Sequence, residues 1–169
     1  MPRLAAAPSH LAHPRRRVAL VARSLLDRTQ VKRLSQGRLD FDALPRRDAR
    51  SLAHALGFRL PSEAELEWLA RDGGSTRFTL DAATTVGPSR FGVEMLFHGQ
   101  WAEDDWHSSY EGATGVSAPW LDGEPCGVCR GGYLPQSAGE RLFMLAGVRG
   151  HGKHVPSFVG VRLAAALVG

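Results

Sequence analysis

The chain has 169 residues, of which 43% are apolar and 22% are charged, and its formal net charge is +4 at pH 7. This length and composition predict a single globular domain that is large enough to bury one hydrophobic core. No apolar run approaches the roughly 20 residues that a membrane-spanning helix needs, so we expect no membrane partner.

The basic excess rests on arginine, because only 2 residues are lysines, and the sequence pI is about 9.7. Part of it is concentrated in residues 15–17 and in the pair Arg46 and Arg47. Such clusters can bind phosphates or an acidic partner. No nucleic-acid-binding motif accompanies them. We therefore interpret them as solvated faces and do not expect a nucleic acid partner.

Residues 1–16 are basic and rich in alanine, proline and histidine, which predicts a flexible arm ahead of a single domain over residues 17–169. Arg23 interrupts the apolar run that follows this arm, and no small-residue cleavage site comes after it. We therefore expect no secretory signal and a cytoplasmic location. The first strand should lie within residues 18–31, and residues 32–39 should form a short turn of helix or a loop.

Two helices are predicted near residues 46–56 and 63–71. In the first, apolar residues recur at i, i+3, i+4 and i+7 from Ala49, and a glycine ends the pattern. In the second, Ser62 can cap the helix through its hydroxyl while Glu65 reaches back to the cap amide.

Beyond residue 74, glycine and proline become frequent and apolar runs become short, which is typical of irregular loops between short strands. We expect strands near residues 126–130, 142–149 and 158–163. The backbone groups of such loops must be satisfied by side chains, and arginines are suited to clamp carbonyl and carboxylate groups from inside. The expected internal clamps are Arg130, Arg149 and Arg162.

Five segments, in order along the chain, are similar to motifs of the formylglycine-generating-enzyme (sulfatase-modifying-factor) superfamily. The run RLPSEAELEW at residues 59–68 resembles the RLPTEAEWEW signature of that family. The other four are LLDRTQV at residues 25–31, RFGVEMLFHGQWAEDDWH at residues 90–107, CRGGYL at residues 129–134 and FVGVRLA at residues 158–164. They resemble the family's DRTPVT strand, its FGLYDMxGNVWEWxxDW run, its RGGSW motif and its closing IGFRLA.

The resemblance implies an α+β fold of the C-type-lectin-like (sulfatase-modifying-factor) type. This fold has two helices, short twisted antiparallel strands and much irregular loop. The residues that match the family motifs are then structural: Arg59, Glu63, Glu67, Trp68, Arg130, Gly131, Gly132, Gly160 and Arg162.

The catalytic cysteine pair of this family is replaced in the chain. Members that use oxygen and copper carry two cysteines downstream of the RGG motif, and soft thiolates are the ligands that Cu(I) selects. The corresponding positions here hold Gln136 and Arg141, and neither side chain can be a thiolate. The resemblance therefore implies a divergent member that does not make formylglycine, and we expect no copper cofactor.

Cys126 and Cys129 are the only cysteines, and a CxxC spacing can be half of a zinc site, a redox pair or neither. There is no second CxxC, and the segment is typical of a strand rather than of a helix N-terminus that would lower a thiol pKa. We favour two unconnected, largely buried thiols, with a metal or disulfide role as the alternative.

A structural calcium ion is possible at Glu103, Asp104 and Asp105, the most acidic part of the chain, because oxygen-rich loops of this kind bind Ca²⁺. The resemblance supports this site, since family members often carry calcium near the corresponding run. The asparagine that would supply an amide oxygen is absent here.

The function that we favour is a non-catalytic domain whose loops bind a protein or a small ligand. Aromatic residues on ordered loops give large contact areas with a polar tip. The expected binding residues are Trp101, Asp104, Asp105, His107, Tyr133, Gln136, Arg149, His151 and His154. The alternative is a metal-dependent oxidoreductase, of the formylglycine-generating or sulfoxide-synthase kind, with a non-standard site built from His107, His151 and His154. The chain lacks the HxxxHxE pattern of the iron-dependent sulfoxide synthases.

Overall fold

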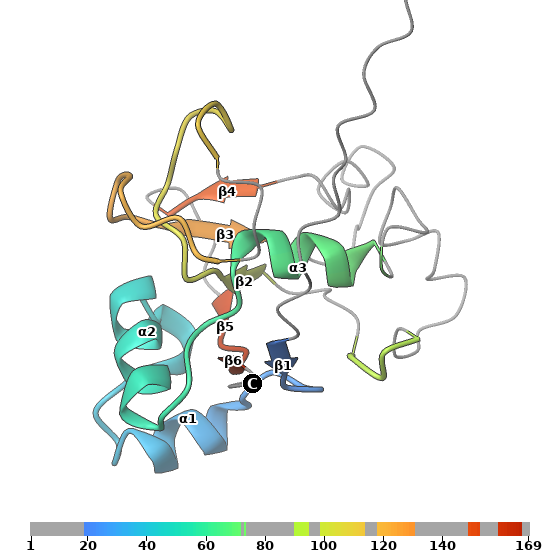
Figure 1. The fold of residues 1–169 in the computed structure, drawn as a ribbon. Helices are drawn as coiled ribbons and strands as arrows, with labels where there is room; N and C mark the ends of the chain where they lie inside the picture. The colour runs from blue at the N-terminus through green and yellow to red at the C-terminus, as the bar shows by residue number, and fades with distance from the viewer. Residues whose placement is uncertain are drawn as a thin grey trace, which may run out of the picture.

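The computed structural model describes residues 19–71, 73, 90–94, 99–113, 118–130, 149–152 and 159–166. Within these residues the protein is an α+β fold (Figure 1). Its helices are α1 (Arg28–Leu34), α2 (Arg46–Ala55) and α3 (Glu63–Ala70), with a 3-10 turn η1 (Phe41–Ala43). Its strands are β1 (Ala19–Val21), β2 (Gly99–Trp101), β3 (Val128–Arg130), β4 (Arg149–His151), β5 (Val159–Gly160) and β6 (Ala164–Ala166).

The described strands form two sheets. One is the antiparallel pair of β1 and β6, in which Ala19 lies opposite Ala166. The other has the strand order β4-β3-β2-β5, where β2 pairs antiparallel with β3 and parallel with β5. The expectation of purely antiparallel strands is therefore wrong, because the segment that returns as β5 enters the sheet in the same direction as β2.

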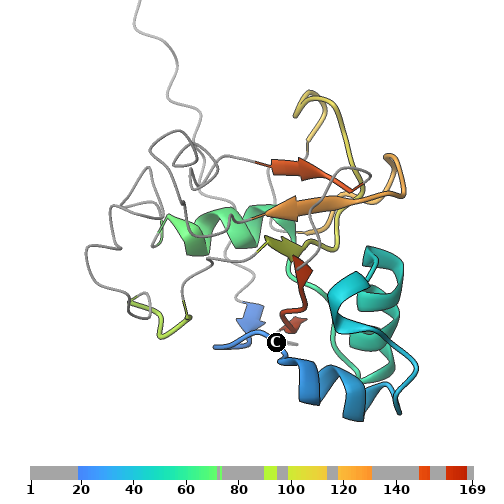
Figure 2. The same ribbon diagram turned by 180° about the vertical axis from the view of Figure 1, so that it is seen from behind.

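The helices lie on different sides of this sheet. Figures 1 and 2 show α1 and α2 side by side at one end of the molecule, while α3 runs alongside the four-stranded sheet. Helices α2 and α3 confirm the two predicted helices. The predicted capping box of α3 is present, with the Ser62 hydroxyl accepting from the Glu65 amide at 3.2 Å and the Glu65 carboxylate accepting from the Ser62 amide at 2.8 Å.

Helix α1 corrects the expectation of two helices only. It occupies residues that we assigned to the first strand and the turn after it, and β1 ends at Val21. The helix begins with a second capping box, in which the Asp27 carboxylate accepts from the Gln30 amide and the Gln30 side chain accepts from the Asp27 amide, both at 2.8 Å. Val31 then anchors the helix in the core.

The main hydrophobic core lies between α2 and the central strands, where Leu52, Trp101 and Val159 are buried together. Trp101 is only 3% exposed, and its indole N–H donates to the carbonyl oxygen of Leu44 at 2.9 Å. The expected binding role of Trp101 is therefore wrong, since the side chain fills the core. A second, smaller cluster joins Leu66 of α3 to Ala102 and Val128, with Trp106 packed against it.

Arg162 is buried and acts as an internal clamp, as the sequence predicts. Its guanidinium donates to the carbonyl oxygens of Ala22 and Arg23 at 2.6 and 2.7 Å and to the side-chain oxygen of Gln100 at 2.7 Å. Burial lowers the pKa of Arg162 to about 10. None of the described helices is long and apolar enough to cross a bilayer.

The remaining predicted strands agree with the structure where it describes them. Strand β3 lies within the predicted segment 126–130, and β5 lies within 158–163. Of the predicted strand 142–149, only the last residue belongs to the described part, and there it opens β4.

Candidate functional site

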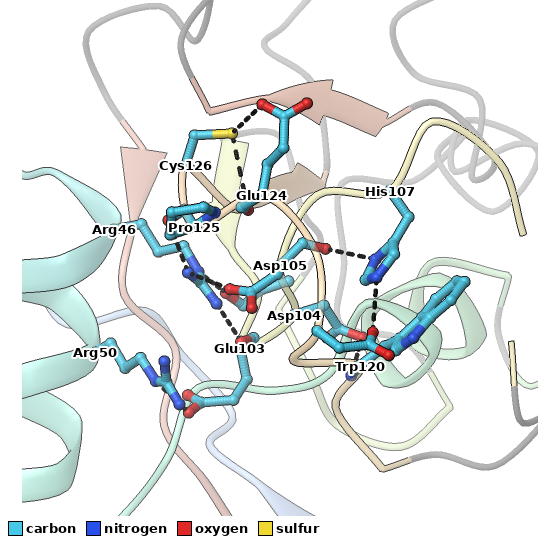
Figure 3. Close-up of polar contacts among 12 residues, drawn as sticks. Arg46, Arg50, Glu103, Asp104, Asp105, His107, Trp120, Glu124, Pro125 and Cys126 are labelled. Carbon is cyan, nitrogen blue, oxygen red and sulfur yellow. Dashed lines mark hydrogen bonds and ion pairs between the residues drawn. The ribbon is translucent and has the colours of Figure 1, made fainter.

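The acidic run of residues 103–105 is held by α2. Arg46, in the first turn of that helix, is buried, and its guanidinium contacts three backbone carbonyl oxygens and one carboxylate (Figure 3). The contacts are with the carbonyls of Ala102 at 3.1 Å, Pro125 at 3.1 Å and Glu103, and with Oδ1 of Asp105 at 3.0 Å. Gly127 leaves room for this side chain, because a Cβ atom there would collide with it.

Two further residues on the same face of α2 complete the clamp. Arg50 and His54 follow Arg46 at intervals of four residues, which places all three on one helix face. The Arg50 guanidinium lies 2.6 Å and the His54 ring 3.0 Å from Oε1 of Glu103. The second oxygen of Glu103 accepts the backbone N–H of Leu60 at 3.0 Å. The Glu103 carboxylate is thus engaged on both oxygens.

Asp104 connects the acidic run to its surroundings through the backbone. Its Oδ2 accepts the amide of Glu63, the first residue of α3, at 2.7 Å, and its Oδ1 accepts the amide of Trp120 at 3.0 Å. Burial raises the pKa of Asp104 above its usual range, and these two backbone hydrogen bonds oppose the shift.

The acidic run is therefore a structural joint, and the expected binding roles of Asp104 and Asp105 are wrong. Both side chains are buried and directed at groups of the protein itself. The three carboxylates also point to separate partners, and the described residues contain no group of three or more His, Cys, Asp or Glu side chains arranged to hold a metal ion. The structure thus gives no support for calcium at this run.

A shallow hollow opens directly after the joint. It has a volume of about 380 Å³ and is lined by residues 106–109, Glu111, Trp120, Gly123 and Glu124. We call this feature the loop hollow. Two segments build it, and they are tied together by reciprocal backbone hydrogen bonds between Trp106 and Glu124 at 2.8 and 2.9 Å.

An aromatic pair forms the wall of the loop hollow. The His107 ring stacks on the Trp120 indole with centroids 3.5 Å apart and planes 9° apart. Its Nδ1 lies 3.2 Å from the carbonyl oxygen of Asp105 and its Nε2 lies 2.9 Å from Oδ1 of Asp122 (Figure 3). Gly123 permits this packing, since a Cβ atom there would lie 2.6 Å from the His107 ring.

Exposed carboxylates lie around this wall. The side chain of Asp122 is 80% exposed, and Glu111 and Glu124 are exposed residues that line the loop hollow itself. Of the expected binding residues whose side chains the structure describes, His107 is the one that lines this hollow. Trp120 also lines this hollow and is not among the nine expected binding residues, although its aromatic ring on a loop favours binding in the same way.

The motif residues of α3 and β3 form a second internal cluster. Arg130 of β3 is buried, and its Nη2 lies 2.8 Å from Oε1 of Glu63 and 3.0 Å from Oε2 of Glu67. The same nitrogen donates to the Tyr110 hydroxyl at 2.6 Å, and that hydroxyl donates to Glu63 at 2.7 Å. The predicted role of Arg130 as an internal clamp is confirmed.

The other described motif residues are mostly structural as well. Arg59 makes a two-pronged ion pair with Glu65 at 2.7 Å for each contact. A Cβ atom at Gly160 would lie 2.8 Å from the Leu25 side chain, so glycine allows close packing there. Trp68 differs, because it is 45% exposed and stacks on Phe91 with ring centroids 4.5 Å apart.

The two cysteines are not joined by a disulfide, and they occupy different environments. Cys129 is 5% exposed, and burial raises its pKa to about 12. Cys126 is partly exposed, with its sulfur 3.9 Å from the carbonyl oxygen of Glu124. We expected both thiols to be largely buried, but only Cys129 is.

The remaining predicted residues lie on β4 or outside the described part of the chain. Arg149 and His151 lie on β4, where the backbone of His151 is opposite Val128 and that of Arg149 is opposite Arg130. Outside the described residues are Gly131, Gly132, Tyr133, Gln136, Arg141 and His154. A metal site built from His107, His151 and His154 is therefore not seen in the described part of the chain, where His107 contacts Asp122 and Trp120.

These observations define an α+β domain in which buried arginine clamps support an aromatic and acidic loop hollow. No protein-family model and no curated protein matches the chain. A solved structure that is similar is PvdO from Pseudomonas aeruginosa, with a TM-score of 0.56 and 20% identity, over 73% of this chain and 60% of PvdO. The chain thus spans about 60% of the length of PvdO, and the two share a related fold.

Proposed function

We propose that this chain is a non-catalytic domain of the sulfatase-modifying-factor kind, with a C-type-lectin-like arrangement, and that it binds a ligand through the loop hollow. The observation that carries the proposal is the division between residues 103–105, which the protein uses internally, and the aromatic pair of His107 and Trp120, which forms the wall of a solvent-facing hollow. A rigid support under partly buried aromatic rings that face a hollow suits a recognition surface.

The family assignment is supported by the role of the motif residues. Arg59, Arg130 and Arg162 come from three separate motifs, and each of them makes ion pairs or hydrogen bonds inside the protein. Residues kept for such contacts explain why short motifs persist in a sequence that matches no family model.

The absence of formylglycine-generating activity is supported by the thiol chemistry. Gln136 and Arg141 stand where that activity needs cysteines. Of the two cysteines present, Cys129 has its pKa raised to about 12 by burial, so it stays protonated at neutral pH. A protonated thiol is a poor nucleophile and a poor ligand for Cu(I).

The catalytic half of the proposal is tested with a cysteine-containing peptide of the sulfatase type. The peptide is incubated with the protein, copper and a reductant under oxygen, and aldehyde is measured by mass spectrometry. We expect no product, while a formylglycine-generating enzyme in the same assay gives aldehyde. Stoichiometric aldehyde from this protein would overturn the proposal.

The binding half is tested with an array of short peptides of mixed composition. Wild-type protein and a Trp120→Ala variant are applied to the same array, and their melting temperatures are compared. We expect a set of peptides that bind wild type at least about fivefold better than the variant, as truncation of an aromatic hot spot predicts. If no peptide distinguishes the two folded proteins, the loop hollow is not the binding surface.

A further inference from the structure

We propose that Tyr110 is a positioning residue of the loop hollow. Its hydroxyl ties residues 108–113, which we call the strap, to α3 and β3 and so holds the strap in the conformation that binds a ligand. This inference rests on the proposed binding function, because it explains how the same hollow is kept ready to bind.

The strap forms one side of the loop hollow, since Ser108, Ser109 and Glu111 line it. All of its residues are exposed. Its backbone hydrogen bonds are local. The Ala113 amide donates to the carbonyl oxygen of Tyr110 at 3.1 Å, and the Glu111 amide donates to the Ser109 hydroxyl at 3.3 Å. Such bonds shape a turn but do not attach it to other elements. An exposed segment of this kind opens at a low free energy unless a side chain anchors it.

Tyr110 supplies such an anchor. The residue is 52% exposed, yet its hydroxyl lies between two charged side chains that are buried. Nη2 of Arg130 donates to the hydroxyl at 2.6 Å, and the hydroxyl donates to Oε1 of Glu63 at 2.7 Å. The side chains of Arg130 and Glu63 are only 3% and 7% exposed. Hydrogen bonds to charged groups are stronger than neutral ones, and burial strengthens them further. One hydroxyl therefore fastens a surface segment to the interior.

Glu63 is a common reference point for the strap and for the aromatic wall. Its carboxylate accepts from Tyr110 of the strap, while its backbone amide donates to Oδ2 of Asp104 at 2.7 Å. Asp104 in turn accepts the amide of Trp120 at 3.0 Å. The strap and Trp120 are thus both positioned relative to the first residue of α3. Removal of the Tyr110 hydroxyl releases the strap and leaves the contacts of Trp120 in place.

The loss of this anchor has a kinetic signature. A released strap samples several conformations, and a ligand binds only the fraction of molecules in which the strap is in place. The apparent affinity falls by that fraction. A mutation that removes a direct ligand contact acts mainly on the dissociation rate. Release of the strap acts instead on the association rate, because fewer molecules are ready to bind when the ligand arrives.

The experiment uses Tyr110→Phe, which removes the hydroxyl and keeps the ring. Amide hydrogen exchange of the free protein is followed by mass spectrometry. We expect the amides of the strap to exchange about tenfold faster in the variant, as the loss of a hydrogen bond to a charged group predicts, with α3 and β3 unchanged.

The same variant is tested with the peptides that bind wild type through Trp120, by surface plasmon resonance. The association rate should fall about threefold or more, while the dissociation rate should stay within about twofold of wild type.

Glu67→Gln is the matched control, because it alters another contact of the same Arg130 nitrogen, at 3.0 Å, and leaves the Tyr110 hydroxyl in place. Strap exchange and peptide association should stay within about twofold of wild type, and melting temperatures establish that both variants are folded. Equal release of the strap by Glu67→Gln would overturn the specific role of the hydroxyl.

Two further outcomes separate this inference from the proposed function. If Tyr110→Phe leaves strap exchange unchanged, or speeds it without slowing association, the positioning role fails while the binding function stands. If no peptide depends on Trp120, the binding function fails and the positioning role fails with it.

Discussion

The acidic run at residues 103–105 and the loop hollow that follows it are neighbours in the sequence, yet the fold uses them in opposite ways. In the run, the carboxylates of Glu103 and Asp105 meet Arg50 and Arg46 of α2 and are withdrawn from solvent. In the hollow, Asp122 and Glu111 remain exposed beside an aromatic pair. Residue type alone does not decide which of these carboxylates are buried. The difference is whether another element brings an arginine to the carboxylate.

The strongest test of this comparison removes the arginine that makes the run structural. Arg46→Met deletes contacts to three carbonyls and leaves Asp105 buried without its partner. Breaking a buried ion pair from one side costs about 3–5 kcal/mol. We expect a loss of that size in the free energy of unfolding, measured by urea denaturation.

Arg47→Met is the control for that variant, because the adjacent side chain is 86% exposed and pairs only with Asp48, at 3.4 Å, among the described residues. Its effect should stay within about 0.5 kcal/mol. A similar loss for both variants would mean that the buried contacts of Arg46 contribute nothing specific.

A second test compares Trp101, which is buried in the core, with Trp120, which lines the loop hollow. Trp101→Phe leaves the Leu44 carbonyl without its donor and leaves a gap in the core, which costs about 2 kcal/mol. Trp120→Phe keeps a ring against His107 and should cost less than about 1 kcal/mol. Peptide affinity should respond in the reverse order, with only Trp120→Phe weakening it. Equal effects of both variants on affinity would place the binding surface elsewhere.

Asp104 links the acidic run to Trp120 of the loop hollow through a backbone hydrogen bond. Its replacement should lower the free energy of unfolding only modestly. Asn at this position keeps one acceptor for the amides of Glu63 and Trp120, so we expect a loss of about 1 kcal/mol, as for a helix cap. Because the pKa of Asp104 is raised, its carboxyl stays protonated to a higher pH in the folded state than in the unfolded state.

The stability contributed through Asp104 therefore falls as pH rises from about 4, near the unfolded pKa, through the higher folded pKa. Asparagine does not ionise. The stability difference between wild type and Asp104→Asn should thus be smaller at pH 7 than at about pH 4, in urea melts at the two pH values. A difference that grows with pH would mean that the folded pKa lies below the unfolded one.

The smallest effect concerns the two cysteines, which we expect to differ in their reactivity toward a thiol label. Iodoacetamide at pH 8 should modify Cys126 in the folded protein and leave Cys129 unmodified, because burial raises the pKa of Cys129 to about 12. Both should react in denaturant, as counted by mass spectrometry. Labelling of Cys129 in the folded protein would contradict its burial.

The sequence predicts what local chemistry determines. Ser62 and Glu65 define the start of α3 because a capping box involves four consecutive residues. The same signal at Asp27 and Gln30 was available for α1, but the resemblance of that segment to a family strand obscured it. The extended segments around Val128 and Val159 were also predictable from their composition.

The candidate site could not be predicted in the same way, because its contacts are distant in sequence. Arg46 meets Glu103 across 57 positions and Pro125 across 79 positions. No periodicity or spacing in the sequence indicates which arginine will bind which carbonyl oxygen. The pairing of the acidic run with α2 therefore became visible only in three dimensions, and with it the reason why Trp101 is core and Trp120 is not.

The pairing of β1 with β6 has a mechanical consequence. Ala19 and Ala166 lie opposite each other in an antiparallel register, so a force that pulls them apart would load the backbone contacts one pair at a time. Such a sheet opens like a zipper and resists weakly. Beyond the backbone hydrogen bond from Ala22 to Leu163, the guanidinium of Arg162 binds the carbonyl oxygens of Ala22 and Arg23. A pulling force applied at Ala19 and Ala166 would thus break the β1–β6 pairing first, at low force, and the contacts of Arg162 only later, at higher force.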